Sequence, residues 1–322
     1  MADLATSLVV DIIMFLLSFV AIGCSGLVFY ISIFRNGIRG ADFLPIIIMC
    51  TLDSLMGISW IVFDFMKWIS NYEIMHDENI ACQIQAVISL GVLEASIDCA
   101  TILAILRFVV IILQVKINKI YFNIATVAMV SLSITLAIVS GSYKSGRVMP
   151  TNSYCELITL ADIPFNIFYS KWLLVRIFLL PIVIAVCYGG ILIKYINLLR
   201  NLKLLKYSYY VDQNFDNANN TKSYTEPVRN IKRSITALAI GIVAYIIVFA
   251  PSYITNIVQD ITNADNREVW VDAIVVISIM SIILINPIFA LLVHDETKVE
   301  MEHLFGKWKL SSSPNLSSYN LA

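Results

Sequence analysis

The sequence predicts an all-α integral membrane protein built as a bundle of seven transmembrane helices. Of the 322 residues, 59% are hydrophobic and only 14% are charged, whereas about 25% of a typical soluble domain is charged. The hydrophobic residues gather in seven long runs separated by short polar stretches. Each run has the roughly 20 residues that a helix needs to cross a bilayer, while strands of a membrane barrel are about half as long.

The expected spans follow one another along the chain. A short extracellular N-terminus, residues 1–7, precedes the first of them. The first run has no basic segment before it and is too long for a signal peptide, so we interpret it as a spanning helix. The seven spans cover residues 8–34, 43–66, 81–113, 120–141, 164–196, 233–258 and 270–293.

The third span is expected to be the central helix. As a helix, the segment from Cys82 to Arg107 rises about 37 Å, slightly more than the hydrocarbon core of about 30 Å. These two residues are therefore expected at opposite membrane faces. Between them the span carries more polar chemistry than an anchoring helix needs, in the form of Ser89, Glu94, Ser96 and Asp98.

Three segments outside the spans are expected to be polar or bound to the membrane surface. Residues 200–229 are rich in asparagine and lack apolar periodicity, which indicates a mobile cytoplasmic loop. After residue 293, Val299, Leu304 and Phe305 can form the apolar face of a short amphipathic helix. The serine-rich residues 307–322 are expected to form a disordered cytoplasmic tail.

The distribution of positive charge predicts the orientation in the membrane. Most of the 22 Lys and Arg residues fall on the side that holds the C-terminus. The opposite side holds only Lys67, Lys144, Arg147, Lys171 and Arg267. Because cytoplasmic loops are enriched in Lys and Arg, we expect the N-terminus outside and the C-terminus in the cytoplasm.

The same topology sorts the six cysteines. Four of them fall within spans, where small apolar packing residues are common. Only Cys82 and Cys155 face the oxidising exterior, so they form the one disulfide that the compartments favour. That bond would fold the loop after the fourth span back over the helix bundle.

In the order and spacing of its spans and of particular residues within them, the chain resembles the rhodopsin-like (family A) G-protein-coupled receptors over about residues 8–306. The cysteine pair matches the extracellular disulfide of the family, and Arg107 lies at the family's interval from Cys82. The other matching positions, one or two to a helix, are Asp53, Phe178 with Pro181, Pro251, and Asn286 with Pro287. The resemblance implies a receptor that senses an extracellular ligand and activates a heterotrimeric G protein at the plasma membrane.

The resemblance also implies roles for two groups of residues. It places Asp53, Ser96 and Asn286 together, where family members bind a sodium ion with waters; a water-filled hydrogen-bond cluster is the alternative. It assigns Arg107 to the G protein, with Lys232 and Arg233 at the start of the sixth span. An arginine that reaches the interface and only supports the topology is the alternative for Arg107.

Several positions depart from the family pattern or belong to its switch. Leu106 and Phe108 replace the acid and tyrosine that flank the arginine, which predicts a weakly restrained inactive state with raised basal signalling. Ala290 replaces a tyrosine of the seventh helix.

The resemblance also gives five kink and switch positions: Phe178, Pro181, Phe249, Pro251 and Pro287. The prolines are expected to kink their helices, because proline removes a helical hydrogen bond and bends the helix.

Charged residues inside the spans are costly and need partners. Glu94 and Asp98 share a face of the third helix, and the resemblance puts Arg176 beside them. We expect Arg176 to pair with Glu94, or else with Asp98, either as a structural pair or as an anchor for ligand. Together with Ser89, these residues define the candidate ligand pocket.

The ligand class stays open at this stage. Ser89 stands where amine receptors have an aspartate, which disfavours an amine. The seventh span has no lysine, which excludes a retinal Schiff base. An apolar lining with Glu94 and Arg176 suits a small polar or lipid-like molecule. No cofactor is expected other than a sodium ion at Asp53, and the expected partners are the G protein, the ligand and membrane lipids, with no nucleic acid.

Two other functions are weaker interpretations of the same residues. A transporter or channel could use Asp53, Glu94, Asp98 and Arg176, yet it needs a continuous polar path and these acids lie only on the second and third spans. An intramembrane enzyme lacks histidines in the spans for a metal site. We therefore expect a receptor and no enzymatic activity.

Overall fold

The computed structural model describes residues 4–35, 42–77, 79–115, 118–157, 163–212, 221–262 and 267–293. Seven of its helices are long and apolar enough to cross a membrane, which confirms the predicted all-α fold of a multi-pass membrane protein. The helices are α1 (Leu4–Tyr30), α2 (Phe43–Ile69), α3 (Ile80–Phe108), α4 (Lys119–Ser142), α5 (Pro164–Asp212), α6 (Thr221–Thr262) and α7 (Val269–Val293).

The structure differs from the expectation in two segments. The first helix begins at Leu4, so part of the expected extracellular N-terminus, residues 1–7, is helical. In the segment expected to be a mobile loop, α5 continues to Asp212 and α6 begins at Thr221. Residues 200–212 contain neither Gly nor Pro, so no helix-breaking residue ends α5 earlier. Residues 294–322, with the expected amphipathic helix and tail, lie outside the described part of the chain.

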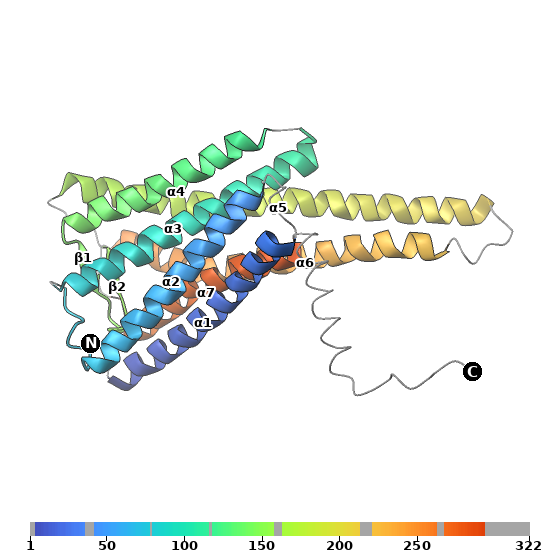
Figure 1. Cartoon of the computed structure of the whole chain (residues 1–322). Coiled ribbons are helices and arrows are strands. Elements are labelled where there is room, and N and C mark those ends of the chain that lie inside the picture. Colours follow the sequence, from blue (N-terminus) through green and yellow to red (C-terminus); the bar gives the residue numbers. More distant parts are fainter. Residues whose placement is uncertain are drawn as a thin grey trace, which may run out of the picture.

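The third helix is the centre of the bundle, as expected. It contacts α2, α4, α5 and α7 as well as both strands of the chain (Figure 1). It begins at Asn79, whose side chain accepts a hydrogen bond from the Ala81 N–H at 3.0 Å, a typical N-cap. A π-helical turn, η2 (Val109–Leu113), prolongs it, and η1 (Ile31–Arg35) prolongs α1 in the same way.

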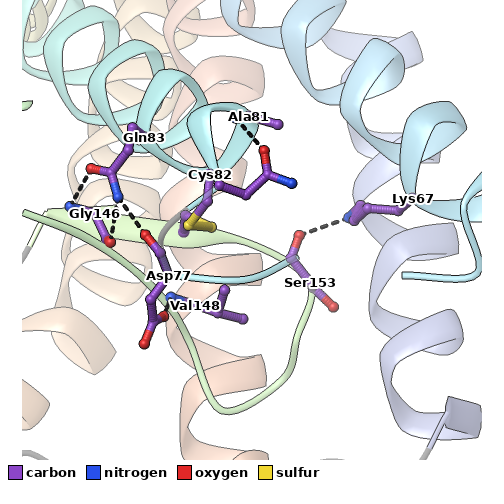
Figure 2. The surroundings of a disulfide bond; sticks show 10 residues. Lys67, Asp77, Ala81, Cys82, Gln83, Gly146, Val148 and Ser153 are labelled. Atoms are coloured by element: carbon purple, nitrogen blue, oxygen red, sulfur yellow. Dashed lines mark hydrogen bonds between the residues drawn. A yellow bond between two sulfur atoms is a disulfide. The ribbon is translucent and has the colours of Figure 1, made fainter. Parts of the chain in front are cut away.

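A short hairpin covers one end of the bundle, opposite the end where α5 and α6 extend side by side beyond the other helices (Figure 1). Its strands, β1 (Gly146–Val148) and β2 (Cys155–Leu157), pair antiparallel. The predicted disulfide between Cys82 and Cys155 is confirmed, with a Cα–Cα distance of 5.4 Å. Figure 2 shows the Gln83 amide next to it, which both accepts from and donates to the backbone of Gly146.

Two glycines allow helices to approach closely near the other end. A Cβ at Gly190 of α5 would lie 2.7 Å from the ring of Phe108, and one at Gly241 of α6 would lie 2.0 Å from the ring of Phe289. Each aromatic ring therefore occupies the space that a side chain at the glycine position would fill. Phe108 packs against α5 by this means.

Candidate functional site

A hydrogen-bonded polar cluster joins three helices in the middle of the bundle. The Ser96 hydroxyl of α3 donates to Asp53 Oδ1 of α2 at 2.6 Å. Asn286 Nδ2 of α7 donates to Ser96 Oγ at 3.0 Å and to Asp53 Oδ1 at 3.4 Å. All three side chains are at most 1% exposed. The structure thus brings together the three residues that the sequence grouped.

Tyr245 of α6 is a fourth member that the sequence reasoning missed. Its hydroxyl donates to Asn286 Oδ1, and its ring packs edge-on against Phe289 at 5.9 Å. A buried tyrosine hydroxyl needs a hydrogen-bond partner, so a tyrosine within an apolar span was the available signal. Through Tyr245 the cluster reaches α6, the helix that carries Phe249 and Pro251.

The cluster suits a small cation held by oxygen atoms. Asp53 Oδ2 is buried and has no hydrogen-bond partner among the described residues, so one carboxylate oxygen is available beside the Ser96 hydroxyl. Hard cations prefer oxygen ligands of this kind. No group of three or more His, Cys, Asp or Glu side chains in the described part of the chain forms a metal site.

A second buried cluster joins α3, α4 and α5. Arg176 donates to Glu94 Oε2 at 3.0 Å, to Ser133 Oγ at 3.0 Å, and to Asp98 Oδ1. Ser133 in turn donates to Asp98 Oδ2 at 2.6 Å. The arginine therefore contacts both acids that the sequence offered as alternatives. Ser133 was missed, because a serine in an apolar span carries little signal by itself.

The geometry of this cluster limits what Arg176 can bind. Both of its terminal nitrogens are taken by protein acceptors, and its guanidinium lies 5.7 Å from the ring centroid of Trp172. The arginine, at 5% exposure, and both acids are buried. A buried charge that loses its partner is destabilised by several kcal/mol. The arrangement therefore favours a structural role over direct anchoring of a ligand.

Arg107 lies at the far end of α3 from the hairpin. Its side chain is buried beside the hydroxyl of Tyr188 in α5, but neither terminal nitrogen makes a hydrogen bond of good geometry to a described residue. Asp42, the residue before α2, lies within electrostatic range of the same hydroxyl. Asp42 is thus an acid near this point that no motif indicated. Leu106, beside the arginine, is buried.

The end of the bundle around Arg107 presents further basic groups. Lys194 of α5 donates to the carbonyl oxygen of Ile111 in η2, so α5 satisfies a backbone group at the end of the third span. Lys232 and Arg233, the other residues predicted for coupling, are exposed on α6.

The predicted switch residues lie along α5, α6 and α7. Phe249 is buried, and its ring stacks on Tyr245 at 6.1 Å. Pro181 and Pro287 lie inside continuous helices, and Pro251 lies within α6. Phe178, half-buried on α5, precedes Pro181 by one turn.

The segment between the strands, residues 149–154, is a lid over the hairpin end of the bundle. Lys67 of α2 is fully buried and donates to the carbonyl oxygen of Ser153 at 2.7 Å (Figure 2). It also pairs with Asp11 of α1 and Asp64 of α2, each at 2.7 Å. Tyr72 donates to Asp11; burial, and then Asp11, raises the pKa of Tyr72 above its usual value.

A second set of polar groups ties the lid to α7. Asp272 accepts from the Tyr154 hydroxyl at 2.7 Å and from the Thr151 N–H at 3.0 Å. Arg267 donates to Glu156 at 3.0 Å. Burial, followed by Glu156 and Asp272, raises the pKa of Tyr154, so its hydroxyl stays protonated and can donate. Although burial opposes its charge, these neighbours hold the pKa of Arg267 above its usual value.

The charges that fix the lid were not singled out from the sequence. Asp11, Asp64 and Asp272 are acids inside or at the ends of apolar runs, and Asp64 stands three residues before Lys67. Charge within an apolar run was the available signal, because such charges need partners. The partners themselves come from distant parts of the chain and could not be assigned from spacing.

Comparison with known proteins gives one kind of match. No protein-family model and no curated protein matches the sequence. Among solved structures, the crystal structure of squid rhodopsin superimposes with a TM-score of 0.67 over 100% of this chain and 93% of its own, at 13% sequence identity. At that identity the likeness shows the fold alone: the chain has the seven-helix fold of a rhodopsin-like G-protein-coupled receptor.

Proposed function

We propose that the chain is a G-protein-coupled receptor that senses an extracellular ligand and activates a heterotrimeric G protein by rearranging its helices. The observation that carries the proposal is the likeness to squid rhodopsin over the whole chain. A fold hosts more than one function, so the arrangement of the site has to agree with it. We find agreement at both ends of the bundle and in its middle.

The inner end provides a surface suited to a G protein. The two buried terminal nitrogens of Arg107 make no hydrogen bond of good geometry to a described residue, and poorly satisfied buried donors are costly. The exposed Lys232 and Arg233 lie on α6. An acceptor-rich segment of a partner that enters between α3 and α6 would satisfy Arg107, which links binding to movement of α6.

The middle of the bundle supports signalling rather than transport. Tyr245 and Asn286 connect α6 and α7 to Asp53 and Ser96, so a shift of α6 changes the whole cluster. The four charges that a transporter could use occupy two separate hydrogen-bonded clusters, and Arg176 contacts two of the acids directly. A sodium ion at Asp53 and Ser96 would offset the buried carboxylate and stabilise one arrangement.

We place the hairpin end outside the cell, with the N-terminus extracellular, the C-terminus cytoplasmic and the receptor in the plasma membrane. The disulfide of the hairpin needs an oxidising compartment, and the excess of Lys and Arg lies toward the other end.

Guanine-nucleotide exchange in membranes that contain the chain tests the function. We expect exchange on at least one subtype from a panel of G-protein α subunits, and its loss in Arg107→Ala. Arg147→Ala is the matched control, because Arg147 is an exposed arginine on β1. Equal exchange in membranes with and without the chain, on every subunit, would contradict the proposal.

A further inference from the structure

Three buried polar groups on three helices have no hydrogen-bond partner among the described residues. They are the indole N–H of Trp60 on α2, the hydroxyl of Ser89 on α3 and the hydroxyl of Ser252 on α6. Trp60 is 2% exposed and Ser252 is 8% exposed. A buried polar group without a partner is destabilising, so three such groups call for an explanation.

The central polar cluster fixes the depth of the first two groups. Asp53 and Ser96 are hydrogen-bonded, so they lie at one level. Trp60 follows Asp53 by seven residues on α2, and Ser89 precedes Ser96 by seven residues on α3, which runs in the opposite direction. Seven residues are two helical turns, or about 10.5 Å, and return to nearly the same face. Both groups therefore lie two turns toward the hairpin, on the faces that form the cluster.

The third group falls at the same level by an independent path. Tyr245 of α6 is bonded to Asn286, a member of the cluster. Ser252 follows Tyr245 by seven residues, again about two turns toward the hairpin. The three unpartnered groups therefore lie at about one depth on α2, α3 and α6, and we refer to them together as the ring.

Aromatic residues border this ring on both sides along the bundle axis. Phe249, stacked on Tyr245, lies one turn below Ser252. Tyr154 of the lid lies above, with its ring centroid 6.1 Å from that of Trp60. Gln85, one turn nearer the hairpin than Ser89 on the same face of α3, is 1% exposed, and neither of its amide atoms has a partner.

The ionic groups around this level are already engaged. Lys67 pairs with two aspartates, Arg176 pairs with Glu94 and Asp98, and Asp272 accepts from the lid. A charged ligand would have to break one of these sets or stay uncompensated in a low-dielectric site. The groups left over are neutral: one indole donor, two hydroxyls and an amide.

We propose that this level binds an uncharged small molecule with an apolar body, which accepts a hydrogen bond from Trp60 and exchanges hydrogen bonds with Ser89 and Ser252. The inference rests on the proposed receptor function and names the chemical class of its ligand. Ionic amines, carboxylates and phosphates are excluded from the class. The lid holds the ligand from above, and Phe249 transmits its presence to Tyr245.

Cysteine labelling tests the proposal without any G protein. Ser89→Cys and Ser252→Cys are treated with three methanethiosulfonates of similar size, carrying a propyl, a trimethylammonium-ethyl or a sulfonato-ethyl group. Each reagent forms a mixed disulfide with the thiol and releases methanesulfinate. Peptide mass spectrometry measures the rate at each position and separates it from that of the free native cysteines.

We expect the uncharged propyl reagent to label both positions at least about tenfold faster than either charged reagent, because the charged groups must be desolvated. Ser25→Cys is the matched control, since Ser25 is buried in α1, is also unpartnered and lies outside the ring. It should react at least about tenfold more slowly with the propyl reagent.

Labelling at Ser89 and Ser252 no faster than at Ser25 would overturn the proposed site, and faster reaction with a charged reagent would overturn the ligand class. The labelling experiment and the nucleotide-exchange assay test different claims, so either can fail without the other. Absent labelling with intact exchange rejects the ligand site alone, and the converse result rejects the receptor function alone.

Discussion

At the residue scale, Arg107 and Arg176 are two buried arginines in opposite situations. Arg176 has protein acceptors on both terminal nitrogens, whereas those of Arg107 make no hydrogen bond of good geometry to a described residue. A satisfied buried ion fixes the helices that hold it, and an unsatisfied one favours any state that provides an acceptor. We therefore propose that Arg176 stabilises the bundle and that Arg107 takes part in signalling.

The missing acid beside Arg107 predicts raised basal signalling. Leu106→Asp places a carboxylate next to the guanidinium and should stabilise the inactive state, because hydrogen bonds to charged groups contribute about 1.5–3 kcal/mol. Basal nucleotide exchange should fall by roughly fivefold or more. Leu106→Asn, which is similar in size and uncharged, is the control. Equal basal exchange in the wild type and in Leu106→Asp would refute the idea of a weak restraint.

The cluster around Arg176 predicts strong coupling to both acids. Arg176→Met should destabilise the protein by about 3–5 kcal/mol, since it leaves buried carboxylates unpaired. Glu94→Gln and Asp98→Asn should each reduce that loss, measured by reversible unfolding in mixed micelles as double-mutant cycles. Lys171→Met, an exposed cation on the same helix, should change little. Additive effects for either acid would show that this acid is not coupled to the arginine.

At the scale of elements, the lid is held by side chains from three helices. Ser7 of α1 donates to the carbonyl oxygen of Thr151 at 2.6 Å, Lys67 of α2 donates to Ser153, and Asp272 of α7 accepts from Thr151 and Tyr154. The disulfide fixes the next residue, Cys155, to α3. Such a segment behaves as part of the bundle, not as a surface loop.

Removing the central contact should release the lid. In Lys67→Met the carbonyl of Ser153 loses its donor and two buried aspartates lose their cation, so amide hydrogen exchange over residues 149–154 should accelerate by about tenfold or more. Lys144→Met, an exposed lysine after α4, is the control. Unchanged protection of residues 149–154 in Lys67→Met would mean that the disulfide and α7 hold the lid without it.

The elements at the other end are joined by aromatic packing. Phe289 of α7 contacts Tyr188 of α5 at 4.9 Å and Tyr245 of α6 at 5.9 Å, in a space that Gly241 leaves open. Tyr188 also lies beside Arg107, and Tyr245 donates to Asn286. Movement of α6 would therefore disturb both Arg107 and the polar cluster that contains Asn286.

At the scale of the whole molecule, the sequence predicted the fold and part of the site. Seven apolar runs give the spans directly, and the outer cysteines give the disulfide, because hydrophobicity and compartment are local properties of the chain. Arg176 contacts Ser133 as well as both acids, and no pattern on α4 indicates that serine. Lys67 and Asp11 meet from different helices, so their pairing depends on packing that periodicity does not encode. The extent of α5 and α6 beyond the expected spans was also missed, because segments that lack a clear apolar periodicity resemble loops in sequence.

The most direct test of the central claim is complex formation between the purified chain and a heterotrimeric G protein after apyrase removes free nucleotide. The account predicts a complex with at least one subtype that survives size-exclusion chromatography, dissociates on addition of GTPγS, is lost in Arg107→Ala and is kept in Arg147→Ala. No complex with any subtype, or one that is insensitive to GTPγS and to Arg107→Ala, would contradict it.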